Sequence, residues 1–315
     1  MRGTVTLPRP ISQGSVPVSL SVPRRLSFAV ALALGAALTV TGTAFAVPPE
    51  RDGPDVVIDA PSPAPSTPET AATGKPGGGG GGGGGGPKVS RGYDISYPQC
   101  GGALPSNPAF AIVGVNGGRV FSANPCLATQ IAWGGGANAG LYANTGNPGP
   151  ALSSFWPNGQ TTPRVCDAAN PDTADCAYDY GWNAASNSFQ TAQSAYASLS
   201  IAASPAAPSW WLDVETSNSW RSGSADSLGL NVAALQGEVD ALRAAGVTKL
   251  GFYSTQQQWN QITGGSLAFS AYPSWLAGGG TLKGAQQLCT RPAFTGGATV
   301  LAQYFASGFD ADQPC

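Results

Sequence analysis

The feature that most constrains the fold is the alternation, after residue 90, of short apolar runs with longer helical or loop-like stretches. Each run has the length of a buried strand. The expected strands are residues 92–96, 110–115, 140–143, 210–214, 250–253, 274–277 and 299–304, and the expected helices are residues 125–133, 180–199, 230–245 and 256–262. This alternation predicts βα units around a parallel sheet, and the length of the segment favours one β/α barrel over two domains.

The first 46 residues have the features of a secretory signal. Arg24 and Arg25 precede an apolar run over residues 28–40, and Ala44-Phe45-Ala46 resembles a small-residue signal-peptidase cleavage site. The alternative is an uncleaved membrane anchor, because the apolar stretch nearly reaches the roughly 20 residues that span a bilayer. The Ala44-Phe45-Ala46 motif favours cleavage before Val47, so we expect a secreted or cell-wall-associated protein without stable membrane insertion.

The composition of residues 47–90 predicts a disordered linker. They are rich in Pro, Ala, Ser and Thr and include an unbroken run of glycines over residues 77–86, which cannot bury enough apolar surface to fold. The expected organisation is therefore a signal peptide (1–46), a linker (47–90) and one α/β domain (91–315), a single modified TIM-like β/α barrel.

All six cysteines follow the linker, and an even number in an exported chain favours disulfides over metal binding or redox chemistry. Sequence order suggests pairing each cysteine with the next, although six cysteines permit 15 pairings and the sequence alone does not choose among them. The suggested pairs are Cys100 with Cys126, Cys166 with Cys176, and Cys289 with Cys315.

The absence of histidine from the sequence excludes several chemistries at once. Ser-His-Asp and Cys-His catalysis and histidine-containing zinc sites all require an imidazole. The formal net charge of -2, with no run of Lys or Arg in the folding region, offers no basic surface for nucleic acid or anionic lipid. We expect no cofactor, no metal and no nucleic-acid partner, and a monomer.

Carboxylates are scarce enough after the linker that the two glutamates, Glu215 and Glu238, can be considered singly. Glu238 falls in a stretch of helical periodicity, where we expect a solvated helix surface. Glu215 follows an aromatic, apolar run from residue 210, and the two-residue period of a strand places Asp213 and Glu215 on one face.

Polar residues also occupy the carboxyl ends of the other expected strands, where β/α barrels build their active sites. These residues are Asp94, Asn116, Asn144 and Ser254. Residues 145–179 fit no regular element and exceed the usual length of a βα loop. We expect this segment to be stapled by Cys166 and Cys176 and to overhang the cleft.

Two acids on one strand suit glycoside hydrolysis, although an acidic pair at this spacing is as often salt-bridged or solvated. The flanking blocks are more specific, because from Arg91 onward the chain resembles the family 25 glycoside hydrolases, lysozymes with a modified β/α barrel. The blocks are Gly92-Tyr93-Asp94-Ile95-Ser96, Trp211-Leu212-Asp213-Val214-Glu215, Leu250-Gly251-Phe252-Tyr253-Ser254, Trp275-Leu276-Ala277, Gln303-Tyr304 and Phe309-Asp310-Ala311-Asp312.

The resemblance implies a general acid at Glu215 and a supporting carboxylate at Asp213. Asp94 and Asp310 would complete the acidic floor, and four converging carboxylates would raise at least one pKa, as a general acid near neutral pH requires. The alternative for Asp94 is a strand-end cap or ion-pair residue. For Asp310, the alternative is that the neighbouring Asp312 takes its place in the acidic floor.

Aromatic residues at strand ends offer flat faces for sugars, and we expect Tyr142, Tyr253 and Trp275 in the cleft. The chain departs from the family at Asn116, where a Lys-Ala-Thr-Glu-Gly type ending is usual, and at Asn144, where Tyr-His-Phe is usual. Both positions line the cleft in the family. We therefore expect both asparagines to contact the substrate and to change which substrate is bound.

The leading hypothesis is an exported hydrolase that cleaves the β-1,4 bond between N-acetylmuramic acid and N-acetylglucosamine in cell-wall peptidoglycan. One alternative keeps the fold and chemistry but changes the extracellular glycan, as the altered strand ends suggest. The other is a barrel that binds wall polysaccharide without cleaving it, against which the intact Asp213 and Glu215 argue.

Overall fold

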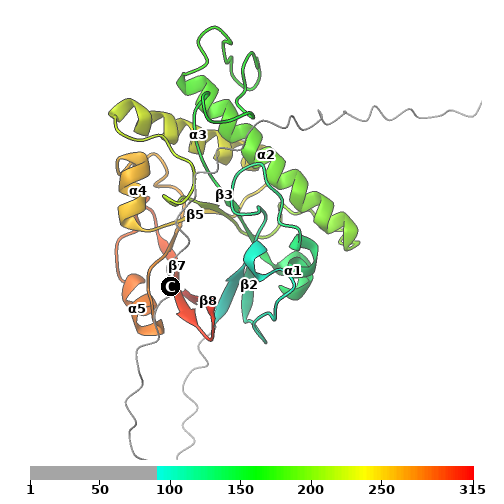
Figure 1. The fold of residues 1–315 in the computed structure, drawn as a ribbon. Coiled ribbons are helices and arrows are strands. Elements are labelled where there is room, and N and C mark those ends of the chain that lie inside the picture. The colour runs from blue at the N-terminus through cyan, green and yellow to red at the C-terminus, as the bar shows by residue number, and fades with distance from the viewer. Residues whose placement is uncertain (1–90) are drawn as a thin grey trace, which may run out of the picture. The chain divides into compact units, whose positions relative to one another are not determined.

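The computed structural model describes residues 91–315, so the predicted signal peptide (1–46) and linker (47–90) lie outside the described residues. The described domain is a closed barrel of eight strands that neighbour one another in chain order, which confirms the predicted fold class (Figure 1). The strands are β1 (Gly92–Ile95), β2 (Phe110–Gly114), β3 (Gly140–Asn144), β4 (Trp210–Asp213), β5 (Leu250–Ser254), β6 (Ser274–Leu276), β7 (Thr299–Ala306) and β8 (Phe309–Pro314).

Five α-helices of the described domain surround the barrel. They are α1 (Leu127–Trp133), α2 (Ala174–Ser198), α3 (Ala225–Ala244), α4 (Gln256–Thr263) and α5 (Leu282–Leu288), with short 3-10 helices η1 (Tyr97–Gln99) and η2 (Gly136–Asn138). Four of the α-helices begin at a Ser or Thr whose hydroxyl accepts a hydrogen bond from a first-turn N–H group. Within residues 91–315, no helix combines the length and apolarity needed to cross a membrane.

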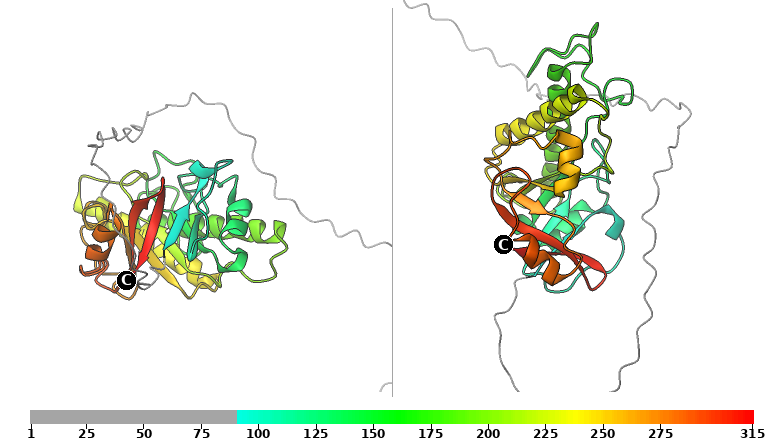
Figure 2. Two further views of the ribbon diagram at one scale, coloured as in Figure 1. Left: turned by 90° about the horizontal axis from the view of Figure 1, so that it is seen from below. Right: turned by 90° about the vertical axis from the view of Figure 1, so that its left-hand side faces the viewer.

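Strand β8 makes this barrel different from eight regular βα units. The first seven strands run parallel, whereas β8 is antiparallel to both β1 and β7 and closes the ring between them (Figure 2). The sequence predicted the parallel strands but neither β8 nor α5. Strand β8 has carboxylates at Asp310 and Asp312 where a buried strand usually has apolar residues, so its apolar signal is weak.

Adjacent tryptophans on β4 illustrate how the strands divide the core into two parts. Trp210 points outward and packs against Phe189 of α2, with ring centroids 5.9 Å apart. Trp211 points into the barrel and meets Trp275 of β6 edge-on at 5.7 Å. The alternation of side chains along a strand therefore fills both the helix-facing layer and the barrel interior. The next inward position on β4 is Asp213.

The prediction for Glu238 is wrong, because its side chain is only 1% exposed. Helix α3 has the barrel on one side and α2 on another, so more of its circumference is buried than an amphipathic pattern indicates. Glu238 contacts the backbone of Gly146, which follows β3, and burial raises its pKa well above the ordinary value. Burial therefore disfavours ionisation of this carboxyl group, and it lies in the packed layer between the helices and the barrel, away from solvent.

The segment after β3 is irregular over most of the predicted range, but residues 174–179 belong to the first turns of α2. The Cys166–Cys176 disulfide ties the irregular part to this helix. The other disulfides are Cys100–Cys126 and Cys289–Cys315, so the pairing follows sequence order. The last of these joins the end of α5 to the residue after β8.

Candidate active site

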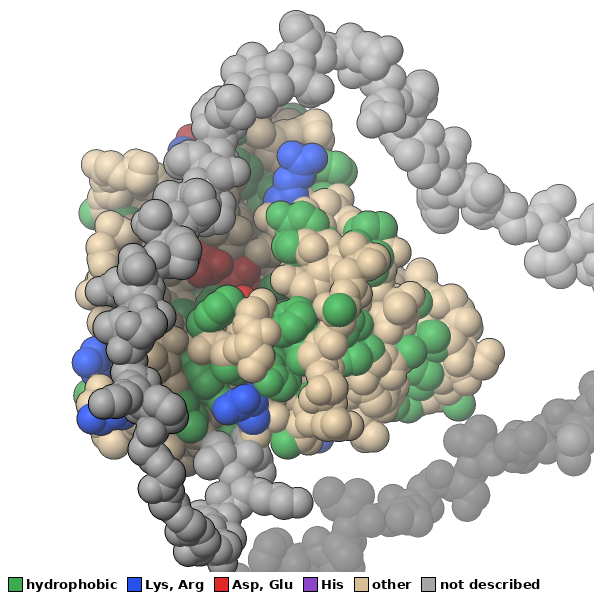
Figure 3. All heavy atoms as spheres, turned by 60° about the horizontal axis from the view of Figure 1, so that its bottom comes forward, with side chains coloured by type: hydrophobic (Ala, Val, Ile, Leu, Met, Phe, Trp, Pro, Cys, Tyr) green, Lys and Arg blue, Asp and Glu red, His purple; other side chains and the backbone are tan. Residues whose placement is uncertain are grey.

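An acidic pocket of about 120 Å³ lies in the barrel near the carboxyl ends of the parallel strands. Figure 3 shows acidic side chains gathered in a hollow of the described domain. The residues that line the pocket are Asp94, Tyr142, Asp213, Glu215, Tyr253, Trp275, Gln303 and Asp310. The fold thus brings together all four predicted acids and all three predicted aromatic residues, but neither predicted asparagine.

Asp213 is the last residue of β4 and is buried. The amide Nδ2 of Asn144 donates a hydrogen bond of 2.6 Å to Asp213 Oδ2. Burial raises the pKa of Asp213 well above its ordinary value, and the nearby charges of Glu215 and Asp94 raise it further, whereas the Asn144 hydrogen bond opposes this effect. Asn144 therefore favours the ionised form of Asp213 within an otherwise proton-retaining cluster.

Glu215 lies two residues beyond β4 and is half-buried at the pocket wall. Burial raises its pKa, Asp310 adds to this, and a hydrogen bond with Gln258 of α4 opposes it. Gln258 also accepts a hydrogen bond of 2.6 Å from the Thr216 N–H group, so the helix holds the chain that carries Glu215. A carboxylic acid that keeps its proton towards neutral pH can protonate a glycosidic oxygen.

Asp94 of β1 is held by a chain of two hydrogen bonds that crosses the barrel interior from β5 and β7. Tyr253 donates its hydroxyl proton to Gln303 Oε1 at 2.8 Å, and Gln303 Nε2 donates to Asp94 Oδ2 at 3.0 Å. Burial and the charge of Asp310 raise the pKa of Asp94 to about 7. Gln303 belongs to one of the sequence blocks that resemble the family, but it was not predicted as a site residue. A polar amide at an inward position of β7 was the available signal.

Two aspartates of β8 face the same side of the sheet but at different depths. Asp310 is the pairing partner of Asp94 across β1 and β8, lines the pocket and keeps contact with solvent. Asp312 is completely buried beside Asp94 and Trp275, and burial raises its pKa well above the ordinary value. Asp310 is therefore the accessible member of the pair, while Asp312 supports the floor beneath it.

Trp275 forms the centre of the aromatic wall. Its ring lies edge-on to Tyr253 at 4.5 Å and to Tyr142 at 6.4 Å between centroids. Only 2% of Trp275 is exposed, so it offers little free face to a ligand. Burial raises the pKa values of Tyr142 and Tyr253 well above the ordinary range, which keeps both hydroxyl groups neutral.

The structure places Asn116 outside the pocket lining, where its side chain is 1% exposed and makes three hydrogen bonds. Its Oδ1 accepts from the Asn144 N–H group at 2.9 Å, and its Nδ2 donates to the Ser122 carbonyl and the Ser188 hydroxyl, both at 3.2 Å. Asn144 is likewise absent from the pocket lining and instead donates to Asp213. Asn116 therefore supports Asn144, which in turn is hydrogen-bonded to Asp213.

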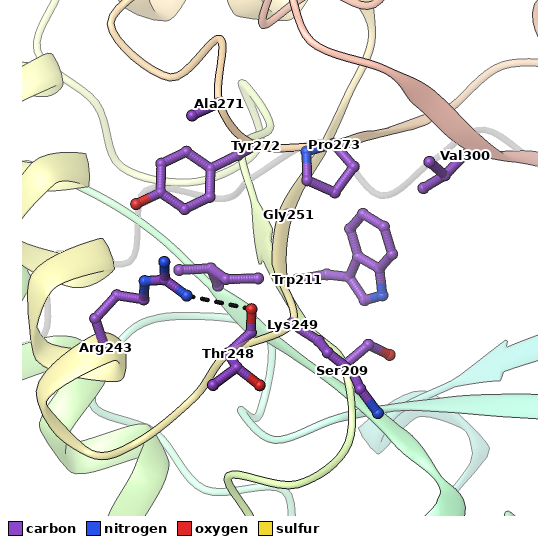
Figure 4. A pocket seen from close by; sticks show the side chains of 11 residues that line it. Ser209, Trp211, Arg243, Thr248, Lys249, Gly251, Ala271, Tyr272, Pro273 and Val300 are labelled. Carbon is purple, nitrogen blue, oxygen red and sulfur yellow. Dashed lines mark hydrogen bonds between the residues drawn. The ribbon is translucent and has the colours of Figure 1, made fainter.

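A larger cavity of about 360 Å³ lies at the opposite, amino-terminal end of strands β4 to β7 (Figure 4). Trp211, Tyr272 and Pro273 supply much of its wall, and Arg243 donates a hydrogen bond of 3.2 Å to the Thr248 carbonyl at its edge. No carboxylate lines this cavity, so the acid chemistry belongs to the smaller one. Among residues 91–315, no cluster of three or more His, Cys, Asp or Glu side chains is arranged to hold a metal ion.

Comparison with known proteins gives matches to lysozymes. A family model described as Lysozyme-like protein 1 matches residues 181–286. The Probable GH family 25 lysozyme 5 of Dictyostelium discoideum is 36% identical over 67 residues, which cover 21% of this chain and 30% of that protein. The match thus spans less than a third of this curated relative.

Solved structures with a similar fold include a muramidase and a lysozyme. The muramidase from Trichobolus zukalii has a TM-score of 0.42 at 18% identity, covering 72% of this chain and 94% of that one. The bacterial lysozyme from Streptomyces coelicolor has a TM-score of 0.43 at 14% identity, covering 72% and 93%. The family model and the curated relative confirm, over the residues that they match, the resemblance to the family 25 glycoside hydrolases that the sequence blocks predicted.

Proposed function

We propose that the chain is an exported glycoside hydrolase, and specifically a peptidoglycan muramidase that cleaves the β-1,4 bond between N-acetylmuramic acid and N-acetylglucosamine. The observation that carries this proposal is the convergence of Asp94, Asp213, Glu215 and Asp310 on one pocket. The name of the curated relative, a probable lysozyme, supports the choice of bond.

In the proposed reaction, Glu215 donates its proton to the glycosidic oxygen as the bond from that oxygen to the sugar C1 breaks. The bonding electron pair leaves with the oxygen, and positive charge develops at C1. Asp213, whose ionised form Asn144 favours, stabilises this charge or orients the 2-acetamido group. Water then adds to C1 and gives a proton to the Glu215 carboxylate, which restores the starting acid.

Asp94 and Asp310 complete the acidic floor in this proposal. Both have raised pKa values, and Asp310 contributes to raising those of Glu215 and Asp94. Their role is to keep the proton of Glu215 in place until it is transferred, because adjacent carboxyl groups disfavour further ionisation.

Export and attachment to the wall form the second part of the proposal. Three disulfides suit an oxidising compartment, which supports secretion. We propose a signal peptide over residues 1–46, a tether over residues 47–90 and a catalytic domain over residues 91–315. Peptidoglycan is the proposed partner, and a monomer is sufficient for the proposed site.

A second candidate is hydrolysis of a different extracellular glycan by the same acids. It is favoured by the asparagines at the ends of β2 and β3, since the family usually has charged and imidazole groups there. Asn144 contacts Asp213 and Asn116 is buried, so neither supplies the ligand contacts expected of the family residues. Non-catalytic binding of wall polysaccharide is the remaining outcome of the test.

The test compares wild type with Glu215→Gln, which keeps the shape of the side chain but removes the acid. Purified walls are followed by turbidity and by release of reducing ends. We expect Glu215→Gln to be at least about 100-fold slower, because general acid catalysis contributes roughly 10²–10⁴-fold. Glu238→Gln is the matched control, since it makes the same change at a glutamate that does not line the pocket.

Three results would count against parts of the proposal. If wild type leaves walls intact but cleaves another glycan, the second candidate replaces the first. If walls, chitin and plant glycans all stay intact, the chain is not a hydrolase of these substrates. If Glu215→Gln cleaves as fast as wild type, the general acid is another residue.

A further inference from the structure

The hairpin of β7 and β8 extends further than the other strands of the barrel. Strand β7 has eight residues and β8 has six, whereas the remaining strands have three to five. Ser307 and Gly308 connect the two with φ angles of 57° and 86°. Two successive positive φ angles are typical of a type I′ turn, whose twist matches that of paired strands and fixes their register.

This register places Phe305 beside the acids. Asp94 is paired with Asp310 across β1 and β8, and Asp310 is paired with Phe305 across β8 and β7. Residues directly opposite each other in neighbouring strands project from the same face of the sheet. Since Asp94 and Asp310 both line the acidic pocket, the side chain of Phe305 projects on the pocket side. Phe305 follows the pocket-lining Gln303 by two residues on the same face of β7, towards the carboxyl end of the strand, so it lies at the rim of the pocket.

Phe305 is held rigidly although its side chain is 61% exposed. Its N–H group donates a hydrogen bond of 3.2 Å to the Gly280 carbonyl, and the Gly279 N–H group donates to the Gln303 carbonyl at 2.9 Å. The backbone around Phe305 is therefore fixed by β8 on one side and by the connection after β6 on the other. Single exposed apolar residues are common on protein surfaces, but few are fixed on a strand in register with an acid of the site.

The aromatic side chains that line the acidic pocket are buried or only partly exposed. Trp275 is almost completely buried, and Tyr142 and Tyr253 are partly exposed, whereas Phe305 is 61% exposed. The pocket of about 120 Å³ is also small, so a glycan chain that reaches the acids must continue over the rim. An aromatic ring can cover the apolar C–H face of a pyranose there.

We infer that Phe305 is a stacking platform that binds a sugar ring of the glycan adjacent to the bond at Glu215. This inference rests on the proposed function and adds a specificity-determining position to it. The platform binds the apolar face of a pyranose and carries no charge, so it contributes to glycan affinity without taking part in proton transfer. Neither a helical pattern nor an acidic motif marks it in the sequence.

The test measures binding of a soluble peptidoglycan tetrasaccharide and of chitotetraose to the full secreted chain with the Glu215→Gln change, which prevents cleavage. Calorimetry gives the dissociation constant for this parent and for the parent with Phe305→Ala, Phe305→Trp or Leu267→Ala. Leu267 is the matched control because it is 65% exposed but lies between α4 and β6, at the opposite end of the barrel.

We expect Phe305→Ala to weaken binding of at least one tetrasaccharide about tenfold, as loss of an aromatic contact does. Phe305→Trp should bind at least as tightly as the parent, and Leu267→Ala within about twofold. Equal thermal melting of the variants would show that the fold is intact. Undiminished binding by Phe305→Ala would overturn the platform alone. Failure of the parent to bind either glycan would overturn the proposed function together with the platform.

Discussion

At the scale of single residues, the site is a group of carboxyls held where ionisation is unfavourable. Asp94, Asp213 and Asp312 are buried, and each has a raised pKa. Amide donors offset part of this effect at two of them, Asn144 at Asp213 and Gln303 at Asp94. Burial thus disfavours ionisation throughout the cluster, whereas each amide donor favours the charged form of the carboxyl group that accepts from it.

The raised pKa of Asp94 predicts that stability depends on pH. The folded chain holds this proton up to about pH 7, whereas an unfolded aspartate releases it near pH 4. Between these values the folded state binds more protons, so the free energy of unfolding falls as pH rises. Urea unfolding at several pH values should show a shallower fall in Asp94→Asn than in wild type. Parallel curves would contradict the assignment.

Some of these residues were predictable from the sequence and others were not. The two-residue period of β4 was sufficient to place Asp213 and Glu215 together. The burial of Glu238 was not predictable, because a helical pattern identifies one apolar face and cannot show that α2 covers a second. The burial of Asn116 outside the pocket lining was not predictable, because a position at the end of a strand does not reveal which way the side chain points.

At the scale of elements, α2 and α3 pack with their backbones in close approach. A Cβ atom at Gly181 would collide with the Ala234 carbonyl, and one at Gly237 would collide with the Tyr178 carbonyl. These glycines let the two longest helices meet directly, which positions the chain on both sides of the site: α2 follows the long segment after β3, and α3 follows β4.

This contact predicts opposite effects for two glycines of the same helix. Gly237→Ala should lower the free energy of unfolding by about 2 kcal/mol or more, because the helices must separate. Gly229→Ala should raise it by about 0.5–1 kcal/mol, since Gly229 has open space around it and alanine favours the helix. Denaturant unfolding of both variants is the measurement. Similar values for the two would show that the close approach is unimportant.

The parallel elements were predictable because each strand has an apolar run and most helices have clear starts. The strand that closes the barrel was not, since its inward residues serve the polar pocket. Helix α5 was missed for a related reason, because it is short and lies within a Gly-rich stretch. The pairing of β8 with β1 depends on contacts between distant segments, which local patterns do not contain.

At the scale of the whole domain, the Cys289–Cys315 disulfide secures the closure of the barrel. It links α5 to the residue after β8 across a separation of 26 residues. Replacing both cysteines by serine should lower the free energy of unfolding by about 3 kcal/mol, the amount expected for a loop of this length. Activity should also fall, because Asp310 lies on the released strand.

The Cys166–Cys176 pair supplies the comparison for that prediction, since it closes a separation of 10 residues outside the barrel. Its replacement should reduce stability somewhat less and leave more of the activity. Unfolding curves and wall hydrolysis measured on both double variants would check this. A larger loss of activity from the outer pair would contradict a closing role for Cys289–Cys315.

The pairing of β1 with β8 has a consequence for how the acidic pocket, and with it the proposed activity, is assembled during folding. Asp94 and Asp310 come from opposite ends of the described domain and meet only across this pair of strands. Contacts so distant along the chain form slowly, because much chain entropy is lost before they are made. A partly folded intermediate could contain the central strands with Asp213 and Glu215 and still lack the acidic floor. Catalysis would therefore be among the last properties that a refolding chain regains, and its return would report the closure of the ring.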